Sequence, residues 1–307
     1  MITRLVFFLT AFFVIAGCER LEKLFVEEDL LERPPSKRCA DCHQKIYNQW
    51  KTSRHAQAWV SEEFIKKTKN RTKTKCLSCH APLEVKAGEK PQLRDKLREE
   101  GVNCFSCHYR EETDSIHGPY KVFSPPHYST YNPEYTSARI CSGCHKKTYD
   151  NWIKTGSNKN CQECHMPSKK DRLIQKFPFM YFHSKKDLHN HSFLPLKADE
   201  QDFSITVVYK GKALMVSVKN LAVPHTVPTA QQGKPKYYLQ IKGFERKETL
   251  LSESEMITPE NGFEYKREKT FIFYVDKKPD EVVVELYRKL SWKKEREFVL
   301  KKRLSID

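Results

Sequence analysis

The stretch CADCHQKIYNQW at residues 39–50 decides which kind of fold this chain is expected to adopt. A close copy, CSGCHKKTYDNW, stands at residues 141–152, so the pattern Cys-x-x-Cys-His-x-Lys-x-Tyr-x-x-Trp recurs at an offset of 102 residues. Each copy is followed by another Cys-x-x-Cys-His string that runs into a proline, at 76–82 and 161–167. The repeat indicates a duplicated module, with one further string at 104–108 inserted in the first copy.

Ten of the eleven cysteines lie in these five strings. Two thiols at this spacing each add to one vinyl group of the same haem, and the adjacent histidine then binds the iron. The predicted cofactor is therefore five covalently bound haem c groups. Their attachment residues and proximal histidines are Cys39, Cys42 and His43; Cys76, Cys79 and His80; Cys104, Cys107 and His108; Cys141, Cys144 and His145; and Cys161, Cys164 and His165.

Three other uses of paired cysteines fit the pattern less well. Zinc sites use Cys-x-x-Cys pairs but do not require a histidine beside each pair. A redox dithiol appears once, near a βαβ pattern. A disulfide framework does not call for five adjacent histidines.

The composition agrees with a core built partly from porphyrin. Hydrophobic residues make up 38% of the chain and charged residues 31%, whereas globular domains have about 45–50% apolar residues. The formal net charge is +16, a value that by itself suggests nucleic-acid binding. Ten haem propionates would offset about −10 of it, so we expect no nucleic-acid partner. Attraction to anionic lipid or to an acidic protein stays open.

Residues 1–17 are predicted to be a signal peptide, because the basic start MITR precedes a short apolar run. The run ends in I15-A16-G17-C18, which is similar to the site where bacterial lipoproteins are lipidated. Cys18 is also the one cysteine outside the five strings. We therefore expect an exported lipoprotein on the periplasmic side of a bacterial membrane, with residues 18–38 as a tether.

Seven histidines lie outside the strings and could supply sixth iron ligands. His55 stands twelve residues after His43, and the second copy has Ser157 at the equivalent position. The predicted metal ligands on the distal side are His55, His117, His127, His191 and His225. His183 and His189 remain alternatives, as do Met166 and Met180, because thioether sulfur also binds haem iron.

The chain resembles the multihaem c cytochromes related to the tetrahaem electron acceptor of hydroxylamine oxidoreductase and to the octahaem reductases. The resemblance rests on WKTSRHA at 50–56, GVNCFSCH at 101–108, CHMP at 164–167, HSF at 191–193 and VKNLAVPHTVPTA at 218–230. Relatives usually read N-x-G-x-G-H-x-x-P-T-G in the last string, where this chain has Ala222, Pro224 and Ala230 in place of glycine. The resemblance implies that His55, His191 and His225 bind haems distant in sequence.

The predicted fold class is α+β. Residues 39–198 are expected to form a loop-rich, mostly helical pentahaem domain, with Tyr47 and Trp50 on one face of a helix after His43. After residue 200 the pattern alternates, as in FSITVVY and ALMVSV, and then continues as YYLQI, TFIFYV and EVVVELY. Residues 199–307 are therefore predicted to be a small β-sandwich whose His225 reaches a haem.

Two functions of different classes fit this sequence. The favoured one is electron transfer between redox partners, with quinol as a candidate donor, through haems that have histidine on both sides of the iron. The alternative is a reductase of nitrite, hydroxylamine or a sulfur oxyanion, which needs one open haem. All five strings keep their histidine, so an enzyme is the less favoured interpretation and no catalytic residue is assigned.

Overall fold

The computed structural model describes residues 26–122, 125–230 and 233–306. The signal peptide, Cys18 and the first part of the predicted tether lie outside these residues. The chain divides into two compact units. Unit 1 consists of residues up to Gly143 together with Cys161–Leu194, and unit 2 consists of Cys144–Asn160 together with Pro195–Asp307. The division differs from the predicted boundaries, because residues 144–160 belong with the β-rich unit rather than with residues 39–143.

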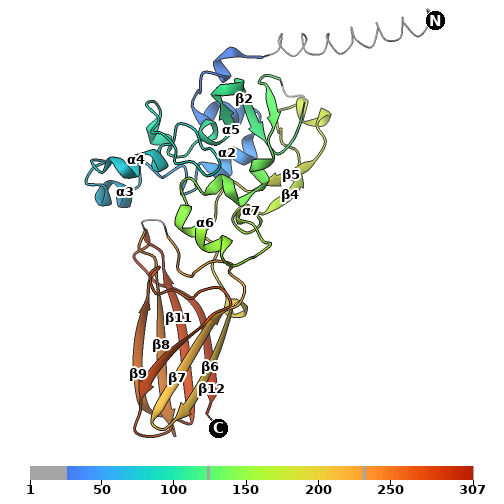
Figure 1. Ribbon diagram of the computed structural model, residues 1–307. Helices are drawn as coiled ribbons and strands as arrows, with labels where there is room; N and C mark the ends of the chain where they lie inside the picture. The colour runs from blue at the N-terminus through green and yellow to red at the C-terminus, as the bar shows by residue number, and fades with distance from the viewer. Residues whose placement is uncertain (1–25, 123–124, 231–232, 307) are drawn as a thin grey trace, which may run out of the picture. The chain divides into compact units, whose positions relative to one another are not determined.

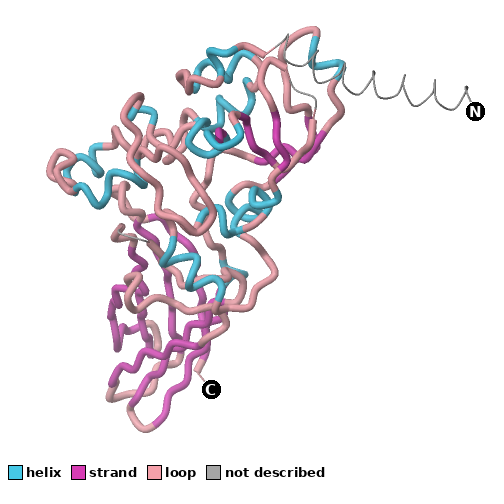
Figure 2. Tube along the Cα trace, turned by 45° about the horizontal axis from the view of Figure 1, so that its top comes forward, coloured by secondary structure: helices cyan, strands magenta, loops and turns pink. Residues whose placement is uncertain are grey.

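Unit 1 consists mostly of loops that connect short elements (Figure 2). Its α-helices have five to seven residues: α2 (Gln44–Trp50), α3 (Glu62–Lys67), α4 (Thr74–His80), α5 (Cys104–His108) and α7 (Cys161–His165). Its strands are β1 (Tyr109–Arg110), β2 (Ser115–Gly118) and β3 (Ser129–Tyr131), which form one small sheet, and β4 (Ser168–Asp171) and β5 (Lys186–His189), which form a hairpin. The expectation of a mostly helical domain is not supported, since single turns around the strings replace long helices.

The 3₁₀ helices of unit 1 connect these elements. They are η1 (Glu28–Leu30), η2 (Ser36–Asp41), η3 (Arg98–Glu100), η4 (Glu111–Thr113), η5 (Pro133–Thr136), η6 (Ala138–Cys141) and η7 (Phe179–Phe182). Among the described residues of this unit, the hydrophobic cluster is small: Trp59, Phe64, Leu77 and Ala81 are buried in it, and Cys76 and Leu93 pack against them. A unit with such a small side-chain core fits one whose interior is completed by apolar groups that are not amino acids.

The two copies of the repeat have the same local structure. Helix α2 begins after His43, whose φ is −101°, and helix α6 (Lys146–Ile153) begins after His145, whose φ is −105°. In each helix the Tyr and Trp rings lie three residues apart with centroids separated by 5.7 Å. The predicted placement of Tyr47 and Trp50 on one helix face is thus observed.

Unit 2 contains α6, η8 (Glu200–Asp202) and a sandwich of two antiparallel sheets (Figure 1). One sheet has the order β10-β7-β6, with β6 at Phe203–Lys210, β7 at Ala213–Asn220 and β10 at Glu268–Tyr274. The other has the order β12-β11-β8-β9, with β8 at Lys236–Glu245, β9 at Glu248–Ile257, β11 at Glu281–Lys289 and β12 at Glu297–Ser305. The C-terminal sheet structure therefore agrees with the predicted β-sandwich.

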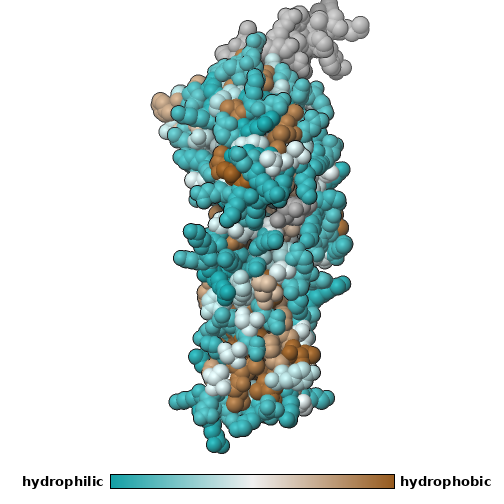
Figure 3. Space-filling view, turned by 90° about the vertical axis from the view of Figure 1, so that its left-hand side faces the viewer, coloured by the Kyte–Doolittle hydropathy of each residue, from teal (hydrophilic) through white to brown (hydrophobic). Residues whose placement is uncertain are grey.

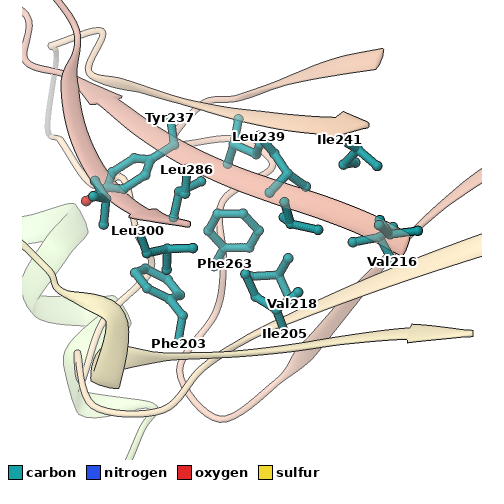
Figure 4. Close-up of a cluster of buried hydrophobic side chains, with 14 of the residues drawn as sticks. Phe203, Ile205, Val216, Val218, Tyr237, Leu239, Ile241, Phe263, Leu286 and Leu300 are labelled. Carbon is teal, nitrogen blue, oxygen red and sulfur yellow. The ribbon is translucent and has the colours of Figure 1, made fainter. Parts of the chain in front are cut away.

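The core of the sandwich lies between the two sheets. Ile205 and Val218 from one sheet face Leu239 and Leu286 from the other, and Phe263 fills the space between them (Figure 4). All five are nearly or fully buried. By contrast, the face of the molecule in Figure 3 is mostly hydrophilic, with only small hydrophobic patches. Among the described residues no helix is long and apolar enough to span a membrane.

Candidate haem sites

Helical geometry brings the three functional residues of a string together. Strings 76–80, 104–108 and 161–165 each lie within one helix, α4, α5 and α7. Residues three and four apart share a helix face, so the two thiols and the imidazole of a string point to the same side. In the other two strings the first cysteine belongs to a 3₁₀ helix and the histidine immediately precedes α2 or α6. All ten cysteines are half-buried and none is in a disulfide.

Four of the five proximal histidines are held by a backbone carbonyl. Nδ1 of His43 donates to Leu173 O at 2.8 Å, and Nδ1 of His80 donates to Ala58 O at 2.7 Å. The same contact joins His108 to His117 O at 2.8 Å and His165 to Leu194 O at 3.0 Å. A metal-bound histidine almost always donates its other ring nitrogen in this way. The contacts leave Nε2 as the nitrogen available to an iron.

Two pairs of imidazoles lie at a separation that fits two ligands of one metal ion. The ring centroids of His43 and His127 are 6.3 Å apart, and those of His108 and His191 are 6.2 Å apart. Imidazole nitrogen binds a first-row metal at about 2.0 Å. A five-membered ring with bonds of about 1.33 Å has its atoms about 1.1 Å from its centre. Two imidazoles on one iron are therefore expected about 6.2 Å apart, which matches both pairs.

Burial keeps these distal rings in the form that binds metal. Desolvation, followed by the nearby His43, lowers the pKa of His127 to about 4. Desolvation, followed by the nearby His108, lowers the pKa of His191 to about 4. Neutral imidazole is the ligand species, so at neutral pH both rings are ready to accept an iron.

Thiols of different strings also lie side by side. The thiols of Cys39 and Cys104, the first cysteines of the first and third strings, are close enough that their interaction raises the pKa of Cys39 and lowers that of Cys104. Cys141 and Cys161, the first cysteines of the fourth and fifth strings, interact in the same way. The structure thus groups four of the strings into two close pairs, a relation that their order in the sequence does not indicate.

His117 has a different environment from the other predicted distal ligands. Its Nε2 lies 2.7 Å from Thr113 Oγ1, and its carbonyl oxygen is the group that accepts from His108. Because its Nε2 already has a hydrogen-bond partner, this geometry does not favour His117 as an iron ligand. His189, which the sequence left as an alternative, has the ligand-like arrangement, with Nδ1 donating to Met166 O at 2.8 Å.

His55 is placed by a close approach of two backbone segments. Its carbonyl accepts from Val102 N at 2.9 Å, and its ring lies 4.1 Å from the ring of Phe193, beside His191. Gly101 has a φ of +61°, and a Cβ there would lie 2.3 Å from His55 O. The glycine of GVNCFSCH is therefore required for the position of the WKTSRHA segment.

His225 lies on a loop of unit 2 that is fixed at three points. The buried Asn220 side chain donates to Val223 O at 2.9 Å and to His225 O at 3.1 Å. Val227 pairs with Phe263, which is part of the sandwich core. These contacts form although alanine and proline replace the glycines of the related motif. Nδ1 of His225 donates to Thr226 O at 2.9 Å, which again leaves Nε2 for a metal.

The third fixed point joins this loop to α6. Asn151 Oδ1 accepts from Thr226 N at 2.5 Å and from Thr226 Oγ1 at 3.0 Å. The hydroxyls of Thr148 and Thr229 are 2.9 Å apart. Sequence analysis assigned no role to Asn151 or Thr226. The only signal was that Asn151 lies in the second copy of the repeat, six residues after His145.

Two half-buried arginines of unit 1 each have a buried donor atom that is not used. Nε of Arg71 and Nε of Arg172 are buried and have no hydrogen-bond partner among the described residues. A buried guanidinium donor without a partner is costly, and a carboxylate is the acceptor that suits it best. Haem propionates are carboxylates, so these donors fit the predicted cofactor.

Comparisons with known proteins agree with this picture. Residues 38–109 match the family model described as cytochrome c554 and c-prime. No curated protein matches the chain. Among solved structures, a penta-heme cytochrome c552 from Thermochromatium tepidum matches with a TM-score of 0.63 and 18% identity, covering 90% of this chain and 100% of that one. A DUF3823 family protein from Bacteroides ovatus matches with a TM-score of only 0.22 and carries no argument.

These matches support a class of protein rather than a particular protein. The family match covers the first three attachment strings completely and ends just after the third, and the structural likeness concerns the fold. Together they support a multihaem cytochrome c with covalent haem, a class associated with electron transfer. The particular relation to the electron acceptor of hydroxylamine oxidoreductase stays a prediction.

Proposed function

We propose that this chain is a pentahaem c-type cytochrome that relays electrons between redox partners. The observation that carries the proposal is the pair of imidazole-to-imidazole separations, 6.3 Å and 6.2 Å, each of which involves a histidine from a Cys-x-x-Cys-His string. When bound, haem supplies a one-electron couple at each iron. Imidazole on both sides of an iron leaves no position for substrate, which favours relay over catalysis.

In this proposal each group of residues has a specific role. The ten string cysteines would attach the haems, and the five adjacent histidines would bind iron on the proximal side. His127 and His191 would be the distal ligands opposite His43 and His108. His225 would serve the haem of string 141–145, because its loop is bonded to the helix that follows His145. His55 and His189 are the proposed ligands for the two remaining irons.

The cellular setting is proposed from the sequence. A lipid on Cys18 would hold the protein on the periplasmic side of a bacterial membrane, where redox proteins, with quinol as one candidate donor, supply and remove electrons. The alternative, a reductase of nitrite, hydroxylamine or a sulfur oxyanion, requires one iron with an open sixth position.

One set of measurements on the haem-loaded protein tests both functions. The intact mass should exceed the mass of the polypeptide by five haems, and electron paramagnetic resonance should show five low-spin irons. The reduced protein should bind little carbon monoxide and should not turn over nitrite or hydroxylamine with an artificial donor. A gain of four haems would refute the count. If one haem per chain is high-spin, binds carbon monoxide and supports turnover, the relay function is contradicted and the reductase function is supported.

A further inference from the structure

The loop of the β4–β5 hairpin exposes an unusual aromatic segment. Residues 177–182 read FPFMYF, and the exposed fractions of Phe177, Phe179, Tyr181 and Phe182 are 75%, 53%, 64% and 81%. Since each such residue has about 200 Å² of surface, the four expose on the order of 500 Å². A typical soluble monomer has no larger apolar patch than about 300–600 Å², and such patches often have a function.

The same hairpin is strongly basic. Residues 168–189 contain six lysines and arginines against two aspartates. Both aspartates have partners, since Asp171 pairs with Lys45 at 2.5 Å and Asp187 pairs with Lys170 at 2.8 Å. Lys169, Lys176 and Lys185 are exposed and have no ion-pair partner among the described residues. The aromatic tip is therefore flanked by Lys176 and Lys185, which pair with no carboxylate among the described residues.

Aromatic rings with flanking lysines are the composition that suits a lipid–water interface. Phenylalanine and tyrosine enter the boundary between headgroups and acyl chains. Lysines and arginines beside them are attracted to anionic headgroups. We propose that the 176–185 loop binds the surface of an anionic membrane. This goes beyond the proposed electron transfer and rests on it only for the haem loading of the protein.

The N-terminal end of unit 1 supports a membrane rather than another partner. The described chain begins at Val26, and Glu27 N donates to Pro126 O at 2.8 Å, next to His127. Cys18 lies eight residues before Val26, a distance of at most about 28 Å in an extended chain. A lipid at Cys18 would keep the bilayer within reach of unit 1.

The base of the loop contacts the first attachment string directly. Gln175 N donates to Cys42 O at 2.8 Å, and Leu173 O accepts from His43 Nδ1. Membrane binding by the loop would therefore bring the haem of string 39–43 to the bilayer. That haem would be the one that exchanges electrons with a partner in or on the membrane.

The test uses the haem-loaded chain from residue 18 onward with Cys18→Ser, so that no lipid contributes to binding. Co-sedimentation is measured with vesicles of phosphatidylethanolamine and phosphatidylglycerol at 3:1 and with phosphatidylcholine vesicles. We expect binding to the anionic vesicles and a decrease of at least fivefold at 500 mM salt. The double variant Phe179→Ser/Phe182→Ser should bind at least fivefold more weakly at low salt.

The matched control is Ile272→Ser/Tyr274→Ser on β10, where the side chains are 55% and 81% exposed and the nearby Lys212 and Lys277 each pair with a carboxylate. It should bind as the parent does. The proposal is overturned if the parent fails to bind anionic vesicles or if the loop variant binds equally well. It is also overturned if the loop variant loses a low-spin haem, because the rings then pack on a porphyrin. The count and spin states of the parent test the proposed function separately.

Discussion

Asn151 Oδ1 accepts two hydrogen bonds from Thr226, from its backbone amide at 2.5 Å and from its hydroxyl at 3.0 Å. Asn151 belongs to the helix that follows the fourth attachment string, and Thr226 follows His225. A contact of this kind fixes a predicted axial histidine relative to a predicted haem. Asn151 is therefore a positioning residue, and its role is open to direct measurement.

Asn151→Ala should loosen His225 without removing any haem. Each lost hydrogen bond contributes about 1 kcal/mol, so the detached state of the loop should become on the order of thirtyfold more populated. We expect a new high-spin signal from one haem and a shifted potential, measured by electron paramagnetic resonance and redox titration. Asn261→Ala is the matched control, because Asn261 Oδ1 accepts from Thr258 N at 2.6 Å and from Thr258 Oγ1 at 3.2 Å. An identical spectrum for both variants would contradict the role of Asn151.

Alanine substitution of distal histidines should separate ligands from structural histidines. His127→Ala and His191→Ala remove rings that lie 6.3 Å and 6.2 Å from proximal imidazoles. Each should convert one low-spin haem to a high-spin haem that binds carbon monoxide. His189→Ala should do the same. His117→Ala should keep five low-spin haems, because its Nε2 is engaged by Thr113. A high-spin haem in His117→Ala would restore the ligand set predicted from the sequence.

Gly101→Ala should disturb the haem for which His55 is the proposed ligand. The new Cβ would lie 2.3 Å from His55 O, and the residue would keep a φ of +61° that non-glycine residues rarely adopt. We expect a lower unfolding temperature and the loss of one low-spin signal from the protein that still matures. Gly118→Ala is the control, since a Cβ there meets nothing within 4 Å. Equal unfolding temperatures for the two variants would show that the close approach is unimportant.

Glu297→Gln should destabilise unit 2 in a pH-dependent manner. Glu297 pairs at 2.5 Å with Arg288, which is buried and donates to Leu196 O. Hydrogen bonds from Lys293 and Arg288 lower the pKa of Glu297. Its stabilising contribution is therefore present above the unfolded carboxyl pKa of about 4.3 and is lost as the pH falls further. At pH 7 we expect a loss of about 1 kcal/mol in chemical denaturation, with little difference from the parent near pH 3.

The edge strands of the sandwich are the part of the fold that the sequence did not predict. The central strands β8 and β11 have strongly apolar stretches and were expected, whereas β9 and β12 were not. Both are edge strands of the four-stranded sheet. Edge strands expose much of their surface and carry charged residues that discourage aggregation, as in ETLLSESEMI. Their sequences therefore lack the alternation that identifies a half-buried strand.

The sequence by itself determined the chemistry that is local along the chain. A thiol, a second thiol three residues later and an adjacent imidazole are brought together by one helical turn, so the five strings, the proximal histidines and the matching helices after His43 and His145 could be predicted without a fold. Only the tertiary structure decided which distant groups meet these strings. The pairing of His43 with His127, the carbonyl of Leu173 and the contact of Asn151 with Thr226 join segments 75 to 130 residues apart. A backbone carbonyl can come from any residue type, and a histidine has the same letter whether its Nε2 faces an iron or, as in His117, a threonine hydroxyl.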